Sequence, residues 1–79
     1  MANARRLHQP HPLVAQLRDA REKAGLSRPR FAARAGFSVS TLEQWEWGDR
    51  TPTLAAITRY ADAVGMALVL APAEEGAEQ

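Results

Sequence analysis

The 79-residue sequence contains no cysteine, which excludes a disulfide framework and a thiolate metal site. It also has no apolar run near the roughly 20 residues that a membrane-spanning helix needs. Arg5 and Arg6 are not followed by an apolar segment, so we expect no signal peptide and no membrane association. The composition is compatible with a reducing cytoplasm, where we expect the protein to act.

The features that enzymes need are scarce as well. The two histidines, His8 and His11, have no carboxylate at a motif spacing and no further ligands to complete a metal site. No glycine-rich phosphate loop is present, and a core this small leaves little room for a pocket of the usual ~300 Å³ or more. We therefore expect no enzyme activity, no metal ion, no cofactor and no small-molecule ligand.

The formal net charge of +1 hides an uneven distribution. Three acidic residues, Glu74, Glu75 and Glu78, lie in the last six positions. Residues 1–70 therefore hold ten basic and six acidic side chains, a net charge of +4. A mildly basic body with an acidic tail is compatible with DNA binding, although many neutral surfaces look similar.

The apolar pattern divides the chain into three regions. Residues 1–11 have none and predict a flexible arm, residues 12–70 predict one helical domain, and residues 71–79 predict a disordered acidic tail. The basic side chains of the arm are Arg5, Arg6, His8 and His11. They suit contacts with phosphates or a minor groove, but a plain disordered terminus is the commoner outcome.

Apolar spacings of three and four residues predict four helices within the domain. The expected ranges are 12–24, 27–35, 38–47 and 53–64. Pro12 suits a first helical turn, Ser27 and Ser38 are good N-caps, and Gly36 ends the second helix. The last helix is capped by Thr53, or by Thr51 if it begins at Pro52.

Residues 66–70, MALVL, leave two alternatives open. The β-branched Val69 and the shortness of the run favour a strand over a fifth helix. A lone strand has unpaired edges, so it would pair with its copy in a second chain and form a two-fold dimer. The expected fold is all-α, with four or five helices and, in one alternative, a short C-terminal strand.

The most informative stretch is residues 31–48, FAARAGFSVSTLEQWEWG, which predicts two short helices joined by a tight turn. On a helical wheel, Leu42 and Trp45 point to one side of the second helix. The other side presents Ser40, Glu43, Gln44 and Trp47. A helix with one pinned face and one polar face suits readout of the DNA major groove, but a solvated face of a small helical bundle has the same pattern.

Three arginines, Arg28, Arg30 and Arg34, crowd the short helix that precedes this one, with no acidic residue among them. They suit either a solubilising face or contact with the DNA backbone, because guanidinium matches phosphate geometry. Arg28 and Arg30 lie in the first turn, where the helix dipole disfavours cations. That placement favours a functional role.

This order of segments resembles the Cro/CI-type (XRE-like) helix-turn-helix family of phage repressors and bacterial regulators. The resemblance covers about residues 13–66 and rests on Gly25, the Leu-Ser pair at 26–27, FAARAG, a capping serine, TLEQWEWG and P-T-L. It implies base contacts from Val39, Ser40, Glu43 and Gln44. With the arginines above, backbone contacts are expected from Arg28, Arg30, Arg34, Ser38 and Arg50. The resemblance also implies a structural pair between Arg21 and Glu46.

The function implied is a sequence-specific regulator of transcription that binds double-stranded DNA. We expect a homodimeric repressor on a two-fold operator, with residues 38–47 in the major groove. The alternative is an antitoxin-type module that binds a toxin-like protein and regulates its own gene. The acidic tail is the only sequence feature that points to this alternative.

Overall fold

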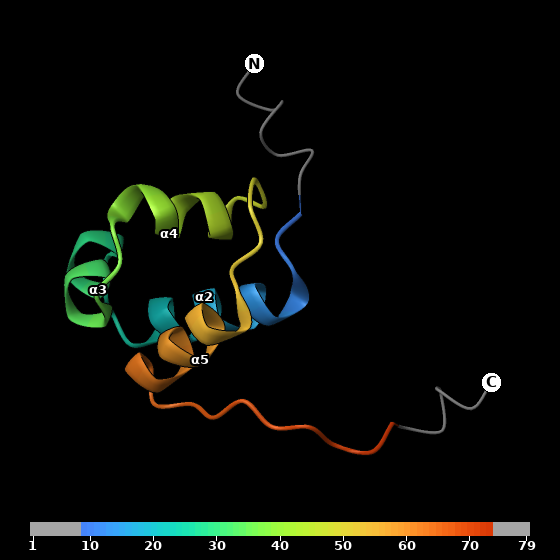
Figure 1. Cartoon of the computed structure of the whole chain (residues 1–79). Coiled ribbons are helices and arrows are strands. Elements are labelled where there is room, and N and C mark those ends of the chain that lie inside the picture. The colour runs from blue at the N-terminus through green and yellow to red at the C-terminus, as the bar shows by residue number, and fades with distance from the viewer. Residues whose placement is uncertain (1–8, 74–79) are drawn as a thin grey trace.

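The computed structural model describes residues 9–73, so the predictions for Arg5, Arg6, His8 and residues 74–79 lie outside the described residues. Four helices are present in this part: α2 (Pro12–Lys23), α3 (Arg28–Ala35), α4 (Val39–Glu46) and α5 (Leu54–Ala63). α2 packs against α5, α4 lies above them in the view of Figure 1, and α3 closes one end of the fold. The expected all-α fold is confirmed. None of the helices in residues 9–73 is long and apolar enough to cross a membrane.

Local sequence signals set the helix boundaries. The side-chain oxygens of Ser27, Ser38 and Thr53 each accept a hydrogen bond from a backbone N–H three residues later, and so cap α3, α4 and α5. Gly36 ends α3 with a φ of 84°, a left-handed conformation that a residue without Cβ adopts at little cost. The helices therefore begin and end within one residue of the predicted positions.

The core is formed by buried apolar residues from all four helices. They are Val14 and Leu17 of α2, Phe31, Ala32 and Ala35 of α3, Leu42 and Trp45 of α4, and Ile57, Tyr60 and Ala61 of α5. The Phe31 and Tyr60 rings lie 4.6 Å apart at 41°, which joins α3 to α5. Burial of a leucine such as Leu42 contributes about 1.5–3 kcal/mol, so the inward face of α4 is firmly held.

Residues 66–70 form neither the strand nor the fifth helix that the sequence predicts. After Met66, whose N–H donates to the Ala61 carbonyl at 2.8 Å, no residue up to 73 donates a backbone hydrogen bond within residues 9–73. Leu68 packs against the core, whereas Val69 and Leu70 are exposed. A strand needs a ladder partner, and the described residues of this single chain supply none. Pairing with a second chain, and a domain limit at residue 70, stay predictions.

Candidate nucleic-acid interface

α4 has one face inside the domain and one face outside it. The buried residues are Leu42, Trp45 and Glu46. On the other side Ser40 is exposed, and Glu43 and Gln44 are partly exposed. Val39 is partly exposed as well, but it packs against the core, so less of its side chain is available. We call Ser40, Glu43, Gln44 and the accessible part of Val39 the outward face of α4.

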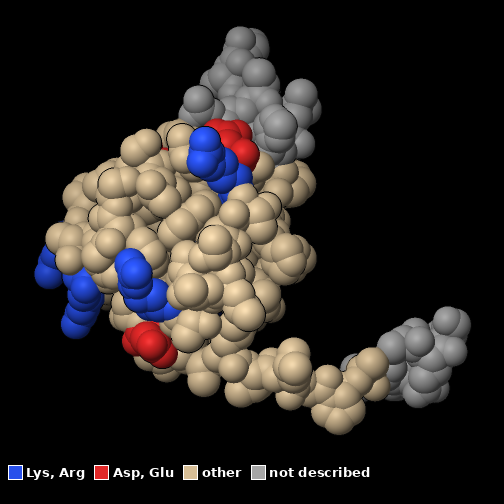
Figure 2. All heavy atoms as spheres, in the orientation of Figure 1, with Lys and Arg blue, Asp and Glu red and all other residues tan. Residues whose placement is uncertain are grey.

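Exposed arginines lie near both ends of this outward face. Arg30 and Arg34 are exposed on α3, and Arg50 is exposed in the turn after α4. Within residues 9–73 their side chains make no hydrogen bond or ion pair, so their N–H donors remain available. Figure 2 shows basic side chains at the α3 end of the molecule and again beside the turn that follows α4, with mainly uncharged surface between them.

The carboxylate of Glu46 holds the C-terminal end of α4 inside the domain. Its side chain is 0% exposed. Arg21 of α2 donates to it twice, from Nε at 3.0 Å and from Nη2 at 2.8 Å. Arg28 of α3 donates from Nε at 2.9 Å, and the Tyr60 hydroxyl of α5 donates at 2.6 Å. One carboxylate therefore joins all four helices, and we call these four residues the Glu46 cluster.

The hydrogen bonds within the Glu46 cluster keep the Glu46 carboxylate ionised. Burial alone would raise the pKa of Glu46, but the hydrogen bonds from Arg21, Tyr60 and Arg28 outweigh burial and hold this pKa below its ordinary value of 4.5. Burial, together with the bond to Glu46, raises the pKa of the Tyr60 hydroxyl. Among the described residues, every buried side-chain nitrogen and oxygen has a hydrogen-bond partner. The cluster is thus fully satisfied as well as buried.

The arrangement of these helices belongs to a known protein family. Residues 12–73, which include all four helices, match the family described as the helix-turn-helix domain. The chain belongs to this family. A helix-turn-helix domain binds DNA and is typically not an enzyme. Searches of curated proteins and of solved structures found no match.

Within this helix-turn-helix domain, Arg28 has a second role that the sequence did not reveal. The prediction gave it a phosphate, whereas the structure directs its Nε to Glu46 and places its guanidinium 5.6 Å from the centre of the Trp47 ring. Its side chain remains 31% exposed, so part of it is still accessible to a ligand. The Arg21–Glu46 contact named by the resemblance is present, but Arg28 and Tyr60 complete it.

Ser38 caps α4 as the sequence predicts, whereas Arg59 makes a contact that the sequence did not indicate. The Ser38 hydroxyl accepts from the Thr41 N–H at 3.0 Å and donates to the Thr41 hydroxyl at 2.8 Å, so capping already uses it. Arg59 of α5 was not a candidate, yet it donates to the Gly36 carbonyl in the turn of the motif. The sequence separation of 23 residues explains why local patterns could not show this contact.

The turn after α4 packs at Gly48 against Gln9, which lies three residues before the first helix. Gly48 has a φ of 84°, and a Cβ built there would lie 2.7 Å from the carbonyl carbon of Gln9. A side chain fits there only if the Gln9 backbone moves. This close approach brings the chain that enters α2 against the C-terminal end of α4.

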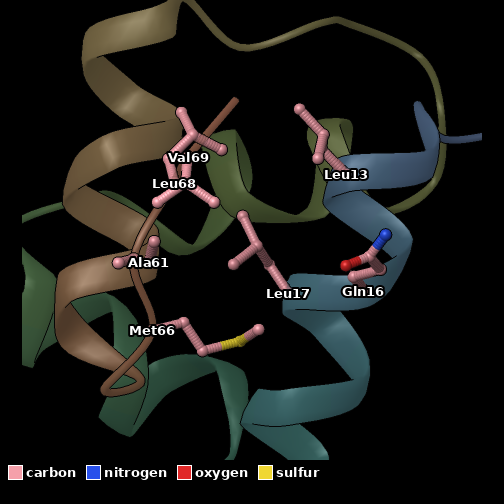
Figure 3. Close-up of a pocket in the computed structure, with 8 residues that line it drawn as sticks. Leu13, Gln16, Leu17, Ala61, Met66, Leu68 and Val69 are labelled. Carbon is pink, nitrogen blue, oxygen red and sulfur yellow. The ribbon is translucent and has the colours of Figure 1, made fainter. Parts of the chain in front are cut away.

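A groove of about 270 Å³ lies away from the outward face of α4. It is formed by α2, α5 and the extended segment after α5, and only Gln16 among its lining residues is polar (Figure 3). This volume falls below the ~300–1,000 Å³ typical of ligand sites. Residues 9–73 contain no group of three or more His, Asp or Glu side chains that could hold a metal ion.

Proposed function

We propose that this helix-turn-helix domain is a sequence-specific regulator of transcription of the Cro/CI type, and that it represses by binding a two-fold operator as a homodimer. One observation carries the proposal. The outward face of α4 is accessible between arginines with available donors, while its opposite face is held by the core and by the Glu46 cluster. A rigid helix with an accessible polar face can enter the major groove.

Each residue of the outward face has a chemically suitable base partner. Gln44 can make a bidentate pair with adenine, Ser40 can bond a base edge or a phosphate, and Glu43 can accept from the cytosine amino group. Val39 can touch a thymine methyl with the part of its side chain that stays accessible. These four assignments are proposals that follow from side-chain chemistry.

The DNA backbone would be held by a second set of residues. Arg30, Arg34 and Arg50 offer guanidinium groups that are unengaged within residues 9–73, Arg28 offers the exposed part of its side chain, and Ser38 contributes from the N-terminus of α4. In a two-fold dimer the half-sites would lie about 34 Å apart, one turn of DNA. We place the protein in the cytoplasm of a bacterium or of a phage-infected cell.

Binding to a duplex enriched from a random pool, measured across a salt series, tests the proposal. We expect the logarithm of the binding constant to fall with the logarithm of salt concentration, because each phosphate contact releases counterions. Arg34→Ala should make that negative slope shallower by about one unit, because one phosphate contact is lost. Lys23→Ala should leave the slope unchanged, since Lys23 pairs with Asp19 on an exposed part of α2. Affinity independent of salt, or equal slopes for both variants, would contradict the proposal.

A second candidate is an antitoxin-type module that binds a toxin-like protein as well as DNA. The observation in its favour is the exposure of Val69 (76%) and Leu70 (101%), which are apolar and have no cover within the described residues. Val69→Asp with Leu70→Asp would then abolish binding to a co-expressed partner but spare DNA binding. If the paired substitution has no effect on partner retention, this candidate is wrong.

A further inference from the structure

The turn between α3 and α4 is fastened to α5 by Arg59. The Nη1 group of Arg59 donates to the Gly36 carbonyl at 3.3 Å, and the guanidinium carbon lies 4.9 Å from the centre of the Phe37 ring. Both contacts fall on the two residues that precede Ser38, the N-cap of α4. Arg59 is therefore attached to the segment from which α4 starts.

These contacts continue into the buried side of α4. The Phe37 ring meets the Trp45 ring edge-on, with 4.8 Å between the centres and 82° between the planes. Trp45 is only 8% exposed. A continuous path of contacts thus leads from Arg59 on α5, through Phe37 in the turn, to the inward face of α4.

The position of Arg59 suits its charge. Gly36 is the C-cap of α3, where the carbonyl groups of a helix lack internal partners and the helix dipole is negative. A guanidinium placed there satisfies a carbonyl and interacts favourably with the dipole, and its planar face can lie over an aromatic ring. A Cβ built at Gly36 would lie 3.6 Å from Arg59 Nη1, an ordinary van der Waals distance, so Arg59 approaches the turn without crowding it.

We propose that Arg59 is a positioning residue for DNA recognition: it fixes the turn from Gly36 to Ser38, and through it the placement of α4, without contacting DNA. This inference rests on the proposed function. It separates Arg59 from Arg30, Arg34 and Arg50, whose guanidinium groups are unengaged within residues 9–73 and are assigned to phosphates. Arg59 should therefore affect sequence preference more than salt dependence.

The test compares Arg59→Ala, Arg59→Lys and the matched control Lys23→Ala, which removes the same charge from an exposed part of α2. Affinity for the enriched duplex and for a scrambled duplex is measured across a salt series, with every variant checked by circular dichroism to be folded under binding conditions. Relative to Lys23→Ala, Arg59→Ala should lose about threefold to tenfold in affinity for the enriched duplex, the size expected for one exposed cation–π contact and one hydrogen bond. Its affinity for the scrambled duplex and its salt slope should match the control.

Arg59→Lys keeps the charge and a donor but not the planar face, so it should recover only part of the lost preference. It also serves if Arg59→Ala fails to fold. An equal loss of affinity for both duplexes, together with a salt slope shallower by about one unit, would identify Arg59 as a phosphate contact and overturn the inference. Full recovery by lysine, or an enriched-duplex affinity equal to that of Lys23→Ala, would also overturn it.

The failure of the proposed function has a different signature. In that case the wild-type chain itself shows no preference between the two duplexes, and the inference about Arg59 falls with it. If the wild-type chain has the preference and Arg59→Ala retains it, only the inference about Arg59 is wrong.

Discussion

The two ends of α4 are held in physically different ways. At the C-terminal end, the fully buried Glu46 carboxylate receives hydrogen bonds from α2, α3 and α5. The N-terminal end is held by the exposed Ser38 cap and by the exposed hydrogen bond from Arg59 to the Gly36 carbonyl. The C-terminal end of α4 is therefore fixed by a few strong, mutually dependent interactions, and the N-terminal end by several weak ones exposed to water.

The largest expected effect is that of Glu46→Ala. It leaves Arg21, whose side chain is 5% exposed, without its carboxylate, and removal of one partner from a buried ion pair costs about 3–5 kcal/mol. That is much of the stability of a domain this small. Urea unfolding followed by circular dichroism measures the loss. A loss of unfolding free energy below about 1 kcal/mol would show that the Glu46 cluster contributes little to stability.

Acid should weaken the same end of α4. The folded-state pKa of Glu46 lies below its ordinary value of 4.5, so the folded protein binds fewer protons than the unfolded chain in that range. The contribution of Glu46 is therefore complete above about pH 4.5 and is lost as the pH falls through the folded-state pKa. Unfolding free energies of wild type and Glu46→Gln should converge in acid. A constant difference down to strongly acidic pH would contradict this.

Tyr60→Phe should have the next largest effect. It keeps the ring that packs on Phe31 but deletes the hydroxyl that donates to Glu46 at 2.6 Å. Loss of a hydrogen bond to a charged group costs about 1.5–3 kcal/mol. In a double-mutant cycle with Glu46→Gln, the double variant should lose less unfolding free energy than the sum of the two single losses, because both act through one carboxylate. Strict additivity would separate Tyr60 from the cluster.

Gly48→Ala should destabilise more than Gly65→Ala. Both glycines have positive φ, 84° and 76°, so both substitutions strain the backbone by about 1–2 kcal/mol. At Gly65 a Cβ meets nothing within 4 Å, whereas at Gly48 it meets the Gln9 backbone at 2.7 Å. Thermal unfolding of the two variants isolates the cost of the Gln9 contact. Equal losses would mean that the chain before α2 moves aside freely.

The smallest effect is expected at the N-terminal end of α4. Ser38→Ala removes a helix cap and should cost about 1 kcal/mol. Ser40→Ala, two residues later on the outward face, should change stability by less than about 0.5 kcal/mol. Urea unfolding of both variants gives the comparison. A larger loss for Ser40→Ala would mean that Ser40 belongs to the folded interior and not to the outward face.

The helices could be predicted from sequence because their signals are local. Ser27, Ser38 and Thr53 cap the helices that they were expected to cap, and Gly36 ends α3. The prediction for residues 66–70 was wrong because the structure there depends on non-local neighbours. A β-branched apolar run favours a strand only where a neighbouring strand can pair with it, and neighbours are not a local property.

The candidate site was only partly accessible to sequence reasoning. The exposure of Ser40 and the burial of Leu42 follow from helical periodicity. The hydroxyl of Tyr60 on Glu46 and the guanidinium of Arg59 on Gly36 span 14 and 23 residues, so they depend on how the helices pack. Arg28 shows the same limit, since its bond to Glu46 spans 18 residues and was not predicted, whereas its predicted contact with a phosphate stays a prediction.

The proposed function requires the outward face of α4 to contact base edges. Selection of bound duplexes from a random pool, carried out in parallel with wild type and Gln44→Ala, tests it most directly. Wild type should select an inverted repeat, and Gln44→Ala should lose preference at one base pair in each half-site with the other positions unchanged. The same consensus from both proteins, or no consensus from wild type, would contradict it.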